Sequence, residues 1–295
     1  MKPYALMLSF IILILPRTWA AKPFETLRWQ TKNGARVVFY QAMEVPMLDI
    51  SIAFAAGSAY DDDKWGLSAL TVRLLNQGNG GLSANTIAEK IAETGAQYEK
   101  VNNQDMVIFN LKTLTTQENL TKATEVFSLI IAHPDFPPES FSREKNQQLM
   151  AITQAQESPD QIANQMFFRA LYKHHPYAHP VNGDTDHVTS LKLEDVQNFY
   201  QHFFVSSNAV IVLVGAIDKS TAEQLAEKIT SELPQGKPAV KITSAQPLTE
   251  EINIEVPFPS SQTIRNFQMV ELGMSSFSPK ILKIIGYELE CCVDE

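Results

Sequence analysis

The chain has 295 residues, of which 44% are hydrophobic and 19% charged, proportions typical of a globular protein with a sizeable core. Its 24 basic and 33 acidic residues give a formal net charge of −9, which excludes a broad basic surface for nucleic acid or anionic membranes. Cys291 and Cys292 are the two cysteines, adjacent and near the end, so disulfides do not staple the preceding chain.

Residues 1–20 are predicted to be a signal peptide that is removed on export. Lys2 gives a positive start, residues 5–15 form a short apolar run, and residues 18–20 offer a small-x-small cleavage site. This run is too short to span a bilayer comfortably, so we expect no membrane span after cleavage. The alternative is an uncleaved N-terminal anchor. We expect export, to the periplasm if the source is a Gram-negative bacterium.

The first half of the chain alternates between strand and helix patterns. Residues 35–40 and 47–56 have the alternating apolar pattern of strands. A helix is expected over 65–78, where four leucines recur at helical spacing, and a second one after Ser83, which is a plausible N-cap. Residues 97–112 alternate again and predict a hairpin that turns near 102–103.

The second half is dominated by helices. Apolar spacing predicts helices over 117–132, 139–156, 162–172, 193–203 and 221–233, with prolines before the second and third. One apolar run, 208–215, reads as a buried strand. Antiparallel hairpins combined with long helices predict an α+β fold rather than a doubly wound one. The expected domain division is 1–20 signal peptide, 22–235 α/β domain, 236–249 linker and 250–295 the start of a second domain.

Several landmarks occur in a fixed order. These are AAGSAYDDDKWGLSALTVRLLNQG at 55–78, HPDFPPESFSREKNQQL at 133–149, and HPYAHPVNGDTDHVTSLKLEDVQNFYQHFFVSSNAVIVLVGAID at 175–218. In this order they resemble the pitrilysin/insulinase family of zinc peptidases, the inverzincins, over about residues 24–261. The resemblance implies a LuxS/MPP-like α/β roll, with a mostly antiparallel sheet flanked by long helices. Active members of the family have two such halves around a peptide chamber.

The resemblance also implies where zinc chemistry would lie. Active members carry His-x-x-Glu-His on the first helix, so that two His one turn apart face one zinc, and a further Glu comes from the long helix. In this sequence the two His positions fall on Ala69 and Arg73, the general base on Val72, and the third ligand on Ala151. None of these side chains can ligate zinc, so no cofactor is expected.

Two questions about these residues stay open at the level of sequence. Arg73 either fills part of the volume where zinc would sit or points into solvent. Residues 61–63 (Asp-Asp-Asp) either bind a cation or, as we favour, form a solvated start to the helix. His174, His175 and His179 have a spacing that could hold a metal, but we interpret them as structural loop residues.

The resemblance weakens after about residue 263. Residues 250–261 look like the opening strand of a second half, and residues 265–295 read either as an out-of-frame tail or as a short form with apolar residues at 281–285. The favoured function is a non-catalytic homologue that partners an active peptidase of the same family, or forms a homodimer, and holds extended peptides. The alternatives are a zinc metalloendopeptidase with unorthodox ligands and a truncated, non-functional product.

Overall fold

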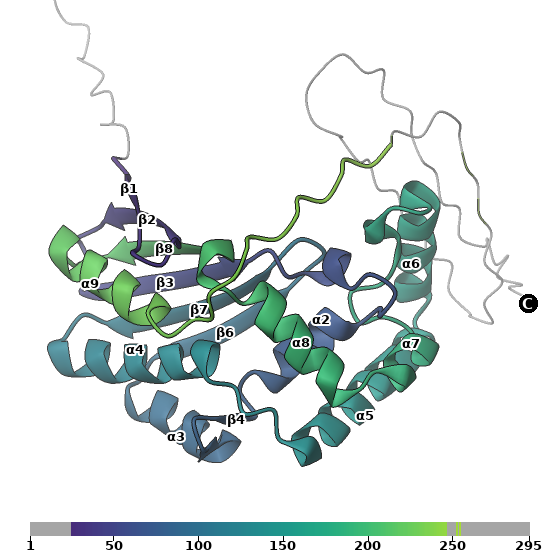
Figure 1. The fold of residues 1–295 in the computed structure, drawn as a ribbon, viewed down its shortest axis with the longest axis horizontal. Coiled ribbons are helices and arrows are strands. Elements are labelled where there is room, and N and C mark those ends of the chain that lie inside the picture. The colour runs from purple at the N-terminus through teal and green to yellow at the C-terminus, as the bar shows by residue number, and fades with distance from the viewer. Residues whose placement is uncertain (1–24, 247–251, 253, 255–295) are drawn as a thin grey trace, which may run out of the picture.

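A computed structural model describes residues 25–246, 252 and 254, and its centre is a six-stranded sheet. The strand order is β1-β2-β8-β3-β7-β6, and every neighbouring pair is antiparallel except β2–β8. Figure 1 shows these strands following one another down the picture. A two-stranded ribbon, β4–β5, lies apart from them. The strands are β1 Leu27–Gln30, β2 Arg36–Gln41, β3 Met47–Phe54, β4 Gly78–Asn79, β5 Leu82–Ser83, β6 Gln97–Asn102, β7 Val107–Leu114 and β8 Ala209–Gly215.

Helices join the strands and cover the sheet. Figure 1 shows α9 and α4 at one end of the molecule and α5, α6 and α7 at the other. The helices are α2 Leu67–Leu74, α3 Ala84–Glu93, α4 Gln117–Ala132, α5 Pro138–Ala155, α6 Pro159–Tyr172, α7 Thr185–Ser190, α8 Leu193–Phe203 and α9 Lys219–Thr230. Three short 3₁₀ helices are η2 Ser58–Tyr60, η3 Pro176–Ala178 and η4 Ser206–Asn208. The predicted α+β fold with a mainly antiparallel sheet is confirmed.

The core lies on one face of the sheet. Alternate residues of β3 from Leu48 to Phe54 are at most 1% exposed, whereas Asp49 between them is exposed. Stripes from α2, α4, α8 and α9 pack against this face in one continuous cluster. At its centre the ring of Phe54 lies 5.0 Å from that of Phe204 and 6.3 Å from that of Phe109. The strand period of two residues therefore decides which side chains the helices cover.

Most elements match the sequence pattern, but one loop differs. Ser83 accepts a hydrogen bond from the Thr86 amide as the predicted N-cap of α3. The loop before α2 was predicted to be solvated, and this is wrong for Asp61, which is 2% exposed. Asp62 and Asp63 are exposed, so the run of three acids divides between interior and surface.

The predicted division into domains remains a prediction. Residues 236–246 contain no helix or strand. The signal segment, most of the 250–295 region and both cysteines lie outside the described residues. Among the described helices, none combines the length and apolar character needed to cross a membrane.

Replacing a core aromatic should test the assignment of the buried face. Phe109→Ala should lower the free energy of unfolding by about 3–5 kcal/mol, because it leaves a cavity beside the rings of Phe54 and Phe204. The control, Val212→Ala, removes a side chain that is 37% exposed on the opposite face and should cost less than about 1 kcal/mol. Urea unfolding of both variants measures this, and equal losses would contradict the assignment.

Candidate functional site

The helix α2 begins at a buried carboxyl group. Asp61 Oδ2 accepts a hydrogen bond from the Gly66 amide at 2.7 Å, and its Oδ1 accepts one from the Ser68 amide at 2.8 Å. These bonds satisfy donors that the first turn of a helix otherwise leaves without partners. Burial raises the pKa of Asp61 to about 8, although the backbone N–H groups of Ser68, Gly66 and Leu67 favour its charged form. Asp61 thus fixes where α2 starts.

The same helix start is tied to α5. Gln148 is fully buried, and its Nε2 donates to the carbonyl of Gly66 at 3.0 Å and to that of Asn182 at 2.9 Å. Gly66 has φ +90°, and a Cβ there would meet the Asn182 carbonyl oxygen at 2.6 Å. A side chain at position 66 would therefore be both strained and obstructed. These contacts hold α5 against α2.

The predicted site residues lie on these two packed helices. Ala69 and Val72 on α2 are each 5% exposed, and Val72 belongs to the main core cluster. Arg73, one turn after Ala69, is partly buried rather than fully extended into solvent. Ala151 lies on α5, three residues beyond Gln148 and so on nearly the same side of the helix. The methyl and isopropyl groups supply packing at these positions and no lone pairs.

A lysine that sequence analysis did not single out lies at the end of α2. Lys100 Nζ, from β6, donates to the carbonyls of Val72 at 2.8 Å and Arg73 at 3.3 Å, and to Asn76 Oδ1 at 2.6 Å. The two carbonyls belong to the last turn of α2, where helical partners are missing and the helix dipole favours a cation. Burial lowers the pKa of Lys100 to about 8; Glu144 opposes this shift and Arg73 adds to it.

A buried carboxylate lies near this lysine. Glu144, on α5, is 7% exposed, and its Oε1 lies 3.5 Å from Arg143 Nε. Arg143 Nη2 also donates to Gln77 Oε1 at 2.6 Å, three residues after the end of α2. The region between α2, β6 and α5 therefore combines one salt bridge with several hydrogen bonds, and its basic side chains lie close to the buried carboxylate of Glu144.

These residues do not fit a zinc site. Zinc in proteins takes Cys, His, Asp or Glu ligands, usually three or four of them. The positions implied by the resemblance carry Ala69, Val72, Arg73 and Ala151. No cluster of three or more His, Cys, Asp or Glu side chains that could hold a metal occurs within residues 25–246. A guanidinium also repels a metal cation, because it stays protonated in proteins.

Two of the histidines pack around Trp65, directly before α2. The ring of His187 stacks on the indole at 4.4 Å, and that of His179 at 5.1 Å. His187 Nδ1 lies 2.7 Å from Asp184 Oδ1, and burial lowers the pKa of His179. The two ring stacks and the contact between His187 and Asp184 stabilise the segment that leads into α2.

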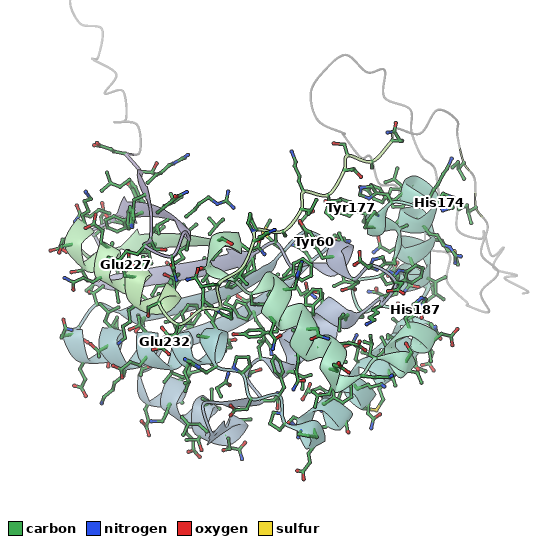
Figure 2. All side chains as sticks on the ribbon, in the orientation of Figure 1. Tyr60, His174, Tyr177, His187, Glu227 and Glu232 are labelled. Atoms are coloured by element: carbon green, nitrogen blue, oxygen red, sulfur yellow. The ribbon has the colours of Figure 1, made fainter. Side chains whose placement is uncertain are left out.

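The remaining histidines do not converge on one site. His175 Nδ1 accepts a hydrogen bond from the Tyr177 amide at 3.2 Å, and the two rings lie 4.6 Å apart. Figure 2 shows His174 and Tyr177 beside α6, whereas Glu232, the ion-pair partner of His133, lies beside α9 at the other end of the molecule. The interpretation of the 174–179 loop histidines as structural agrees with these contacts.

The sequence contains a weak signal for the residues that were missed. Tyr98, Lys100 and Asn102 are the partly buried members of β6, and they alternate with the exposed Gln97, Glu99 and Val101. A lysine on the inward side of a strand needs acceptors there, since burying its charge alone is costly. The alternation could therefore have identified Lys100 as a paired residue, but not its partners 27 and 28 residues earlier.

Removing the Lys100 amine should destabilise the protein. Lys100→Met leaves the carbonyls at the end of α2 without donors, so we expect the free energy of unfolding to fall by about 2 kcal/mol at pH 7. The control, Lys112→Met, removes an exposed lysine whose Nζ lies 3.3 Å from Asp49 Oδ1, and should cost less than about 1 kcal/mol. Chemical denaturation at pH 7 compares the two variants.

The same pair of variants tests the pKa of Lys100. The folded protein loses this proton near pH 8, whereas the unfolded chain holds it to about pH 10.4. Between these values the unfolded state binds more protons, so the unfolding free energy of the wild type should rise with pH relative to Lys100→Met. A constant difference from pH 7.5 to pH 10.5 would contradict the shifted pKa.

Sequence comparisons identify the family of the chain. Residues 36–185 match the family described as insulinase (peptidase family M16), and residues 190–273 match the one described as peptidase M16 inactive domain. An uncharacterized zinc protease of Rickettsia felis is 26% identical over 207 residues, covering 70% of this chain and 50% of that protein. A non-peptidase homolog, YmxG, of Helicobacter pylori is 25% identical over 236 residues, covering 78% of this chain and 54% of that protein.

A solved structure agrees with these matches. The peptidase M16 inactive domain from Pseudomonas fluorescens superposes with a TM-score of 0.77 at 33% identity, covering 81% of this chain and 58% of that one. The chain thus spans about half the length of the curated relatives it matches. With half of its residues matching the first family description, the chain belongs to the insulinase family, peptidase family M16.

Proposed function

We propose that this chain is a non-catalytic member of the insulinase family that acts as the partner subunit of an active peptidase in peptide or protein processing. The observation that carries the proposal is that the motif positions on α2 carry side chains without zinc-binding atoms. Ala69, Val72 and Arg73 occupy the motif positions, and Lys100 donates hydrogen bonds to the end of the same helix. The similarity to a relative named a non-peptidase homolog supports the same interpretation.

The partner role includes holding extended peptides. In the described part of the chain β6 pairs with β7 alone, so its other edge is free of strand partners. Such an edge presents backbone N–H and C=O groups that an added strand can use, and side-chain contacts then select the peptide. Because Lys100 lies on β6, an added peptide would run beside the end of α2. The predicted export would place this activity outside the cytoplasm, in the periplasm of a Gram-negative source.

Metal analysis distinguishes this proposal from an enzyme with unorthodox ligands. The purified full-length chain should contain far less than one zinc per chain and should show no chelator-sensitive peptidase activity, because the implied positions offer no donor atoms. Metal content is measured by mass spectrometry after dialysis without chelator. About one zinc per chain would overturn the non-catalytic assignment.

Restoring the ligands should create the missing site. The triple variant Ala69→His, Arg73→His and Ala151→Glu supplies two His at i and i+4 and one carboxylate from α5, so we expect it to bind about one zinc per chain. The matched control, Ala69→His alone, should bind none under the same dialysis. A triple variant that folds normally by circular dichroism yet binds no zinc would contradict the assignment of these three positions as a former metal site.

The partner role itself is tested by co-purification. The affinity-tagged full-length chain, recovered from its own organism, should bring down a family member that carries an intact His-x-x-Glu-His. Recombining the two purified proteins should raise peptidase activity above that of the partner alone. Recovery of the chain without any such protein, together with no effect on a candidate's activity, would contradict the proposal.

A further inference from the structure

Three basic side chains gather where α2, β6 and α5 meet. We call Arg73, Lys100, Arg143 and the carboxylate Glu144 the basic cluster. Three cations and one acid give it a formal charge of +2, in a chain whose net charge is −9. A local excess of positive charge on an acidic protein attracts anionic groups to that place.

The members of the basic cluster differ in how many of their N–H donors already have hydrogen-bond acceptors within the protein. Lys100 Nζ donates to three acceptors, which accounts for all the hydrogens of an ammonium group. Arg143 donates to Gln77 and to Ser140 Oγ at 3.2 Å, and it lines a pocket of about 620 Å³ together with the acids Asp135 and Glu139. These two basic groups already have partners within the protein.

Arg73 is the exception. Within residues 25–246, no hydrogen bond, ion pair or cation–π contact involves its guanidinium, although the side chain is partly buried. Lys100 Nζ donates to the backbone carbonyl of Arg73 at 3.3 Å, and the charge of Arg73 contributes to lowering the pKa of Lys100. A guanidinium has five N–H donors in a planar fork that matches a carboxylate. A partly buried guanidinium group without an acceptor in the protein is suited to binding a ligand that carries a hydrogen-bond acceptor.

The position of Arg73 relative to β6 indicates what that ligand is. A peptide strand added to the free edge of β6 would lie about 4.8 Å away, and every second side chain would face α2, as Lys100 does. The side chain opposite Lys100 would then stand next to the last turn of α2, where Arg73 lies. An acidic side chain there would meet Arg73 and would need no displacement of Lys100 from its carbonyls.

We propose that Arg73 is a specificity-determining residue that selects extended peptides bearing an Asp or Glu side chain at the position facing Lys100. The inference rests on the proposed function, because it requires peptides to add to β6. It goes further than the proposed function because it assigns a role to Arg73, the cationic side chain at one of the implied metal-ligand positions. The site that would hold zinc in active relatives thus becomes a site for a carboxylate.

Matched peptides test this selection. The probes are fluorescein-labelled, Thr/Val-rich hexapeptides that carry Asp, Asn or Lys at one central position, and binding to the full-length chain is followed by fluorescence anisotropy. We expect the Asp peptide to bind about tenfold more tightly than the Asn peptide, and the Lys peptide to bind most weakly, because a charge-assisted bidentate pair forms with Asp alone. The Asp preference should shrink as salt is raised.

Protein variants assign the preference to Arg73. Arg73→Gln should abolish the preference for the Asp peptide over the Asn peptide, and Arg73→Lys should retain part of that preference. The control Arg169→Gln, an exposed arginine on α6, should change nothing. Unfolding curves establish that each variant is folded before binding is compared.

The outcomes separate the two proposals. If the Asp and Asn peptides bind the wild type equally, the role of Arg73 is overturned while strand addition stands. If the preference survives Arg73→Gln, another cation makes it, which also overturns the role of Arg73. If no peptide binds, or if a central Pro in the peptide leaves binding unchanged, strand addition at β6 fails, and this inference fails with it.

Discussion

The short helix α2 is held at its start by a buried carboxyl group and at its end by a partly buried lysine, and the arrangement of the site depends on this. It has eight residues, too few to persist as a helix in isolation. Asp61 accepts hydrogen bonds from its first amides, and Lys100 donates to its last carbonyls. Burial moves the pKa of each group to about 8, from opposite directions, because the protein interior disfavours either charge.

This arrangement accounts for how α2 and α5 can stay packed together without a metal between them. A structural cross-link between two helices can come from a metal or from side chains that satisfy each other's hydrogen-bonding groups. Here Gln148 joins α5 to the start of α2, and Arg143 joins α5 to Gln77, which lies just beyond the end of α2. Both contacts lie outside the positions at which active relatives would carry His and Glu. In the non-catalytic homologue proposed above, the packing of α2 on α5 would therefore not depend on a metal.

The sequence predicted the elements better than the contacts between them. The periodicity of apolar residues located β3, α4 and α8, because an element that buries one face has apolar residues at regular intervals in the sequence. It misjudged Asp61, since three adjacent acids look like a solvated loop and only the fold shows that the first one turns inward. It also passed over Lys100, whose acceptors lie on a different element. Side chains that act across long sequence separations leave little local trace, and the candidate site consists largely of such residues.

The strand order has a consequence for how the chain comes together. β8, near residue 210, lies between β2 and β3, and pairs with Arg36–Gln41 in parallel and with β3 in antiparallel register. β2 and β3, which follow one another in the sequence, therefore remain unjoined until more than 150 further residues have been synthesised. Such long-range closure is slow and leaves strand edges exposed in the meantime. β8 is the last strand of the described sheet to be translated, and it joins β2 to β3. The sheet therefore cannot be completed until nearly the whole domain has been synthesised.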